Sequence, residues 1–215
     1  MKFGVLGTGS VGQTIAARLV QLGHDVVMGA RNSDNEKAAA FEKKSSPKGT
    51  SGTFSDAARQ GELLFNCTSG AHALDVLKAA GEENLNGKVL IDISNPLDFT
   101  KGMPPSMLTP STDSLGEQLQ RAFPKVLLVK TLNTVTAKVM VEPQSLSSGN
   151  HDMFMAGNDA GAKGRVKEVL QSFGWKHIID VGDITGARAL EMYLPLWVRL
   201  YGTFQTANFN VKMIR

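Results

Sequence analysis

The N-terminal stretch KFGVLGTGSVG, residues 2–12, decides the fold. Its first five residues form a short apolar run, which is typical of a strand buried on both faces of a parallel sheet. Gly7, Gly9 and Gly12 follow with the G-x-G-x-x-G spacing, which permits a sharp turn, a close approach to a pyrophosphate and tight packing of the next helix. The stretch therefore predicts a dinucleotide site, and a tight turn without a ligand is the alternative.

Strand and helix patterns alternate along the rest of the chain. The predicted strands are residues 2–6, 25–29, 53–54, 62–67, 88–93, 125–130, 152–156, 177–181 and 209–214. The predicted helices are residues 11–22, 33–44, 72–80, 114–122, 160–173 and 186–207, with a further brief helix after residue 55. Loops are predicted at 45–52 and 95–112. This alternation predicts an α/β fold, with a Rossmann-type, doubly wound, mostly parallel sheet and a small C-terminal α/β extension. Because 215 residues suffice for one domain with a modest addition, we expect a dinucleotide-binding domain over 1–150 and a small C-terminal portion with a long apolar helix over 151–215.

Composition excludes several classes of protein. Hydrophobic residues make up 42% of the chain and charged residues 20%, as in ordinary globular proteins. The net charge of +3 is small and its cations are dispersed, so we expect no nucleic-acid partner. No apolar stretch approaches the ~18 residues of a membrane span, so we expect no membrane-spanning segment. The four histidines lack metal-ligand spacing, so we expect no metal site. The single cysteine, Cys67, cannot form a disulfide within the chain, which fits a cytoplasmic protein.

The end of the second predicted strand indicates which dinucleotide binds. An NAD site usually places a carboxylate about 20 residues beyond the glycine motif, where it accepts hydrogen bonds from the ribose. This chain has Ala30 there, followed by Arg31, Asn32 and Ser33, with Lys37 one turn further on. Because a guanidinium can hold a phosphate through two parallel hydrogen bonds, these residues predict NADP with its 2′-phosphate on Arg31 and its neighbours. A solvated basic loop is the alternative.

Small polar residues follow three later strands. Ligands of open α/β sheets bind outside the carboxyl ends of the strands, so these residues are candidates for further cofactor contacts. Together with Thr8, Ser10 and Val11 of the glycine loop, the candidates are Thr68, Ser69, Asn95, Pro96, Asn133 and Thr134. Turn chemistry explains any one of them, but three such loops in register favour a shared ligand.

The sequence shows no clear general acid or base. Reduction of a carbonyl or an imine requires a proton donor, whereas hydride exchange with a flavin-like ring mainly requires two rings to be held together. Lys130 is one weak candidate for an acid, because it ends a strand near the expected nicotinamide. We therefore expect an oxidoreductase with a flavin-type acceptor. The alternatives are a β-hydroxyacid or imine dehydrogenase that uses Lys130, and a non-enzymatic NADP(H)-sensing module.

The segment from Leu190 to Phe204 is apolar around nearly its whole circumference, which predicts burial on more than one face. A second copy of the helix across a twofold axis would cover the outer face, so we expect a homodimer. The alternative is that residues 209–214 and the loop 95–112 bury this helix within its own chain.

Five motifs are more specific in their order and spacing than the glycine loop alone. They are GTGSVG at 7–12, GARN at 29–32, KTLNTV at 130–135, MAGND at 155–159, and DVGD at 180–183 followed by ARALE at 187–191. Together they resemble the coenzyme F420-dependent NADP oxidoreductase family. The pattern is also similar to the cytosolic reductase domain of the STEAP metalloreductases.

The resemblance implies hydride transfer between NADP(H) and a deazaflavin such as F420 or a flavin such as FMN or FAD, with the C-terminal portion helping to form the acceptor pocket. It implies that Thr8, Gly9, Ser10 and Val11 hold the pyrophosphate. It also implies that the nicotinamide lies beside Thr68, Asn95-Pro96 and the segment from Asn133 to Ala137. The physiological acceptor and the direction of the reaction stay open.

Overall fold

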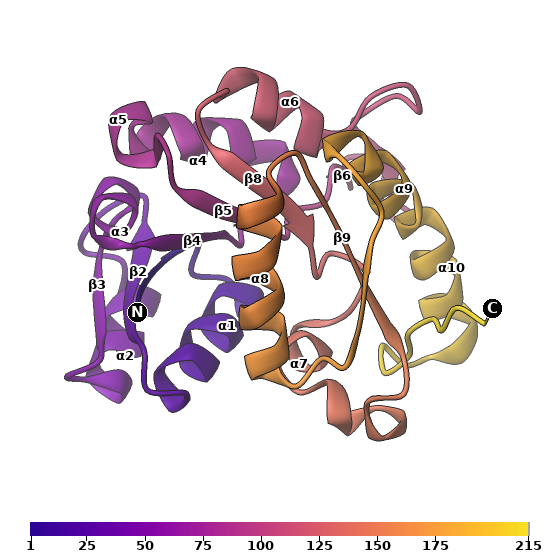
Figure 1. Ribbon diagram of the computed structural model, residues 1–215, viewed down its shortest axis with the longest axis horizontal. Coiled ribbons are helices and arrows are strands. Elements are labelled where there is room, and N and C mark those ends of the chain that lie inside the picture. The colour runs from indigo at the N-terminus through magenta and orange to yellow at the C-terminus, as the bar shows by residue number, and fades with distance from the viewer. Residues whose placement is uncertain (215) are drawn as a thin grey trace.

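An eight-stranded sheet runs through the computed structural model, which describes residues 1–214 (Figure 1). Its strands are β1 (Lys2–Leu6), β2 (Asp25–Ala30), β3 (Gly49–Thr53), β4 (Leu63–Asn66), β5 (Val89–Asp92), β8 (Leu127–Thr131), β9 (Asp152–Gly157) and β10 (His177–Asp180). Their order across the sheet is β10-β9-β8-β5-β4-β1-β2-β3. Every neighbouring pair is parallel except β8 and β9, which are antiparallel. The predicted Rossmann-type, mostly parallel sheet is therefore confirmed.

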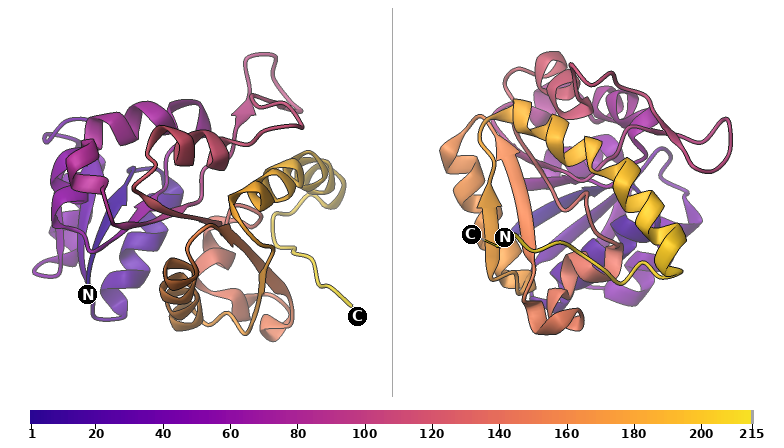
Figure 2. Two further views of the ribbon diagram at one scale, coloured as in Figure 1. Left: turned by 45° about the horizontal axis from the view of Figure 1, so that its top comes forward. Right: turned by 90° about the vertical axis from the view of Figure 1, so that its right-hand side faces the viewer.

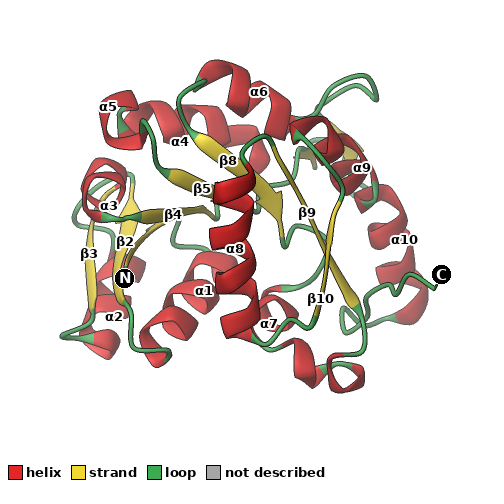
Figure 3. Cartoon of the chain, viewed as in Figure 1, coloured by secondary structure: helices red, strands yellow, loops and turns green. Residues whose placement is uncertain are grey.

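Helices cover both faces of this sheet (Figure 3). They are α1 (Ser10–Gln21), α2 (Glu36–Ser45), α3 (Phe54–Gln60), α4 (Ala73–Ala80), α5 (Glu82–Leu85), α6 (Leu115–Ala122), α7 (Ala137–Val141), α8 (Ala160–Phe173), α9 (Ala187–Met192) and α10 (Leu194–Phe204). Strand β1 explains why the buried strands are apolar throughout. Phe3 and Val5 belong to the same core cluster as residues of α1 and α8, whereas Leu6 belongs to the cluster that includes α3, α4 and α6.

Most predicted elements are present with bounds shifted by one or two residues. At two helix starts, the observed boundary differs from the predicted one because a side chain caps the helix. The helix predicted from residue 33 begins at Glu36, because the side chain of Asn35 accepts a hydrogen bond from the backbone N–H of Ala38 (3.1 Å). Phe54 is the first residue of α3, not a strand residue, because Thr53 and Asp56 cap each other's backbone N–H groups. The strand β3 begins at Gly49, inside the predicted loop 45–52, and ends at Thr53.

The C-terminal prediction was wrong in two places. The single helix predicted over 186–207 is divided into α9 and α10, because Pro195 in the first turn of α10 has no N–H to donate. Residues 209–214 are not a strand. One backbone hydrogen bond joins this tail to β9, and in it the N–H of Asp152 donates to the backbone oxygen of Val211 (3.1 Å). The carboxylate of Asp152 accepts from the N–H of Met213 (2.6 Å), which replaces a further backbone ladder bond.

A small hairpin projects from the predicted loop 95–112 (Figure 2). It pairs β6 (Leu97–Asp98) with β7 (Ser106–Met107), and its tip lies on the same side of the protein as α10. The strands β9 and β10 continue the same sheet as β1 to β8, so both parts of the chain build one sheet, and the division near residue 150 stays a prediction. Within residues 1–214, no helix combines the length and the hydropathy needed to cross a membrane.

Candidate functional site

The glycine loop forms the turn from β1 into α1. Gly7 has φ +116°, a conformation that favours glycine. A Cβ atom on Gly12 would lie 2.1 Å from the carbonyl oxygen of Gly7, whereas one on Gly9 would meet no atom within 4 Å. Gly9 is also the N-cap residue and has no side chain to cap the first N–H groups of α1, which remain available to an anion. The loop thus provides the open cradle that a pyrophosphate requires.

A small hollow beside the carboxyl end of β2, here called the β2 hollow, lies next to this loop. It is lined by Thr8, Ala30, Arg31, Asn32, Asp34, Asn35 and Phe54. Three predicted cofactor residues, Thr8, Arg31 and Asn32, are therefore brought together. Ser33 and Lys37 are exposed and do not line the hollow, and Lys37 is the second residue of α2. Asp34, which was not predicted, also lines the hollow beside Arg31.

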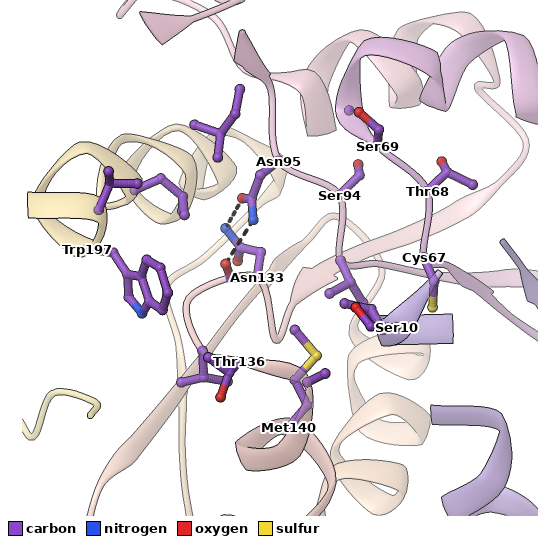
Figure 4. A pocket seen from close by; sticks show the side chains of 18 of the residues that line it. Ser10, Cys67, Thr68, Ser69, Ser94, Asn95, Asn133, Thr136, Met140 and Trp197 are labelled. Atoms are coloured by element: carbon purple, nitrogen blue, oxygen red, sulfur yellow. Dashed lines mark hydrogen bonds between the residues drawn. The ribbon is translucent and has the colours of Figure 1, made fainter. Parts of the chain in front are cut away.

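A second cavity of about 800 Å³, here called the central pocket, opens at the carboxyl ends of β1, β4, β5 and β8 (Figure 4). Seven predicted cofactor residues line it, namely Ser10, Val11, Thr68, Ser69, Asn95, Asn133 and Ala137. Pro96 and Thr134 are buried and do not line it. The glycine loop and the three later loops that were expected to share a ligand thus meet at one cavity.

The opposite wall of the central pocket is apolar, and it includes residues of the C-terminal portion, which the family resemblance implied would help to form an acceptor pocket. This wall is formed by Leu97, Phe99 and Met103 from the hairpin region and by Leu194, Trp197, Val198 and Tyr201 from α10. The rings of Trp197 and Tyr201 are nearly parallel, with centroids 5.7 Å apart and planes inclined by 5°. Their spacing of four residues on a helix was visible in the sequence, but it indicated only an apolar face.

Hydrogen bonds between two asparagines join the loops after β5 and β8 (Figure 4). Asn95 Nδ2 donates to the backbone oxygen of Asn133, and Asn133 Nδ2 donates to Asn95 Oδ1, both at 3.0 Å. Asn133 Nδ2 also donates to the backbone oxygen of Leu190 in α9 (3.0 Å). The polar wall is therefore tied to the element that leads into the apolar wall.

Lys130 lies outside the lining of the central pocket and is fully buried. Its Nζ lies 2.8 Å from Asp92 Oδ2 and 2.9 Å from Glu191 Oε1, and it donates a further hydrogen bond to the backbone oxygen of Ser94. Burial alone lowers the pKa of Lys130, but the two carboxylates outweigh it, so the net shift of the pKa is upward. An ammonium group held in this way keeps its proton, and the geometry gives no support to Lys130 as a general acid.

Thiol, carboxyl and imidazole groups offer little chemistry in the central pocket, whose lining includes one ammonium group, that of Lys138. Cys67 lines the central pocket, but burial and the nearby Asp92 raise the pKa of its thiol, so it stays protonated and a poor nucleophile. No Asp, Glu or His of the described chain lines the central pocket. Among residues 1–214, no group of three or more His, Cys, Asp or Glu side chains is placed to hold a metal ion. The arrangement suits binding and orientation of planar groups.

Comparisons with known proteins agree with this geometry. The model of the family described as NADP oxidoreductase, coenzyme F420-dependent, matches residues 2–96. The crystal structure of a protein from Arthrobacter sp. FB24, described as a putative F420-dependent NADP-reductase, is 48% identical with full coverage of both chains and a TM-score of 0.95. The F420-dependent NADP reductase of Methanocaldococcus jannaschii is 25% identical over 99% of this chain and 98% of its own length.

A longer enzyme also contains a similar region. Metalloreductase STEAP3 of Rattus norvegicus is 28% identical to this chain over a region that covers 91% of this chain. The chain spans 38% of that relative, so the similarity concerns one part of a longer protein.

The first prediction concerns the choice of dinucleotide. Replacing Arg31 with Ala should remove a charge-assisted phosphate contact worth about 1.5 to 3 kcal/mol and weaken NADPH binding roughly ten- to a hundredfold, while NADH binding changes little. Fluorescence titration of both nucleotides measures this. The matched control is Lys37→Ala, which removes a cation outside the β2 hollow and should have a smaller effect. Tighter binding of NADH than of NADPH to the parent protein would refute the prediction.

Proposed function

The chain belongs to the coenzyme F420-dependent NADP oxidoreductase family, and we propose that it transfers hydride between NADP(H) and a deazaflavin or flavin held in the central pocket. One observation carries this proposal: small polar loops form one wall of the pocket and aromatic and aliphatic side chains form the other. Such a pocket suits two planar rings held together, and within residues 1–214 no carboxyl or imidazole group lines it.

The two cavities on either side of the glycine loop support a position for NADP. Thr8 lines the β2 hollow, and Ser10 and Val11, two and three residues later, line the central pocket. A dinucleotide whose pyrophosphate lies on the first turn of α1 would place its 2′-phosphate beside Arg31 and its nicotinamide beside Thr68. The separation of the cavities by a single loop supports this assignment.

The acceptor would lie against α10. Flat aromatic rings stack favourably in offset arrangements, and Trp197 already stacks on both Tyr201 and Phe209. In the protein alone, Trp197 Nε1 is buried without a hydrogen-bond partner among the described residues. An isoalloxazine or deazaflavin ring carries polar edge atoms as well as a flat face, which suits this combination of an aromatic wall and an unused donor.

The second prediction tests the acceptor class. When the protein is mixed with NADPH and FMN, FAD, F420, ferric chelates or small carbonyls, the loss of absorbance at 340 nm should be fastest with a flavin or deazaflavin. Trp197→Leu should slow this reaction more than Phe99→Leu, because Phe99 is exposed at the hairpin. Faster turnover of a carbonyl that is abolished in a folded Lys130→Met variant would favour the dehydrogenase alternative. NADPH binding without any turnover would favour the sensor.

We also propose a homodimer formed through the outer face of α10. Leu196 and Phe204 are each 53% exposed and the neighbouring Met192 is 49% exposed, whereas Trp197 turns inwards to the central pocket. An apolar helix face of this kind is commonly covered by a second copy in a twofold arrangement. The exposed residues, not Trp197, are therefore the expected contacts.

The third prediction concerns this assembly. Light scattering should report about twice the chain mass of 23.0 kDa, and Leu196→Glu should shift the protein towards the monomer because it places a charge in the contact. Leu74→Glu, at an exposed apolar residue of α4, is the control and should leave the mass unchanged. The idea fails if the parent protein is a monomer at micromolar concentration.

A further inference from the structure

Three ionic side chains form a closed cluster behind the central pocket. Lys130 and Asp92 are fully buried and Glu191 is 1% exposed, and the lysine lies between the two carboxylates at 2.8 and 2.9 Å. Removing such charges from water costs free energy that their mutual attraction often fails to recover, so a buried cluster is weak evidence for a contribution to stability. The contacts that the cluster makes with both walls of the pocket favour a role in placing other groups.

The Asp92 side of this cluster reaches the polar wall of the pocket. Asp92 Oδ1 accepts hydrogen bonds from Ser94 Oγ (2.7 Å) and Asn66 Nδ2 (2.8 Å). Asn66 Oδ1 in turn accepts from Thr68 Oγ1 (2.7 Å). The loops after β4 and β5, which carry Thr68 and Asn95, are therefore fixed through one carboxylate.

The Glu191 side reaches the apolar wall. Glu191 lies in α9, and its two carboxylate oxygens accept hydrogen bonds from the N–H groups of Leu115 (2.8 Å) and Gly116 (3.0 Å) at the start of α6. Helix α9 leads directly into α10, where Leu194 and Trp197 line the pocket. Glu191 thus anchors α9, which leads into the helix of the apolar wall, α10.

We propose that Lys130, Asp92 and Glu191 are positioning residues that set the separation of the two walls, with Asp92 orienting the nicotinamide side and Glu191 orienting the acceptor side. The inference rests on the proposed function, in which both rings occupy this pocket. Reacting atoms must approach to about 3–3.5 Å for transfer, so a small displacement of either wall slows the reaction. Lys130 connects the two anchors and does not itself touch the ligands.

Two conservative variants separate the two anchors. Asp92→Asn and Glu191→Gln each remove one negative charge and leave a neutral pair of Lys130 with the remaining carboxylate. An amide has one acceptor oxygen where a carboxylate has two. In Asp92→Asn, the single amide oxygen cannot accept hydrogen bonds both from Lys130 Nζ and from Ser94 Oγ. In Glu191→Gln, the single amide oxygen cannot accept from Lys130 Nζ and from both N–H groups at the start of α6. Each variant therefore loosens one wall while the other keeps its anchor.

The fourth prediction is an opposite pattern in the two variants. Asp92→Asn should raise the Kd for NADPH about tenfold and leave the KM for FMN nearly unchanged, whereas Glu191→Gln should do the reverse. The control is Glu42→Gln in α2, which alters a carboxylate that accepts hydrogen bonds from the N–H (3.1 Å) and the hydroxyl of Ser51, lies outside both cavities, and should lower Tm without changing either constant. Equal changes of both constants in the two variants, or lower Tm with neither constant changed, would reduce the cluster to a structural element and overturn the proposal.

A readout that needs no acceptor keeps the test independent of the proposed function. The chain has two tryptophans, and Trp175 is 2% exposed in the core, so acrylamide quenching reports mainly on Trp197. Quenching should increase in Glu191→Gln and stay at the parent value in Asp92→Asn. If the parent reduces no acceptor, the proposed function fails while this comparison still decides the inference. Equal quenching in both variants would contradict it.

Discussion

Gly12 lies so close to the turn after β1 that a Cβ atom on it would come within 2.1 Å of the backbone oxygen of Gly7. The obstacle is backbone, so no rotamer change could relieve it. This close approach lets α1 begin directly at the carboxyl edge of β1, with its first N–H groups facing outwards. The loops after β4, β5 and β8 begin at the same edge of the sheet, because these three strands run parallel to β1. The central pocket exists because these four strand ends coincide.

Helix α10 and the polar loops of the pocket come from distant parts of the chain and are joined by polar contacts. Asn133 bonds both to Asn95 on the polar wall and to the backbone of Leu190 in α9. The salt bridge of Arg188 to Glu117 (2.6 Å) adds a further connection between α9 and α6. These contacts hold α10 beside the cofactor loops, so the site depends on the C-terminal portion as much as on the glycine loop. A reaction that mainly requires two rings in register fits such a framework.

The sequence predicted those turns and helix ends that depend only on residues close together in the chain. The glycine turn and the helices predicted at 114–122 and 160–173 are of this kind, because Ser114 caps the start of α6 and Gly174, with φ +106°, ends α8. The tail at 209–214 has strand-like residues but lacks the repeated ladder partners that make a strand, which no local pattern reveals. Lys130 looked available at a strand end, because nothing in the sequence shows that Asp92, 38 residues earlier, meets it in the core. The apolar segment from Leu190 to Phe204 likewise did not reveal that Trp197 lines the central pocket, because an apolar helix face does not show which group covers each side.

Nucleotide binding by two alanine variants tests most directly whether the glycine loop holds the pyrophosphate of NADP. Gly9 has φ −71° and ψ −179°, which alanine adopts without strain, and its Cβ would meet no protein atom within 4 Å. Gly9→Ala should therefore keep the parent Tm and bind NADPH more weakly, because the methyl group occupies the cradle. Gly12→Ala should lose about 1–3 kcal/mol of stability through overpacking against Gly7. A folded Gly9→Ala variant that binds NADPH as tightly as the parent would contradict this role of the loop.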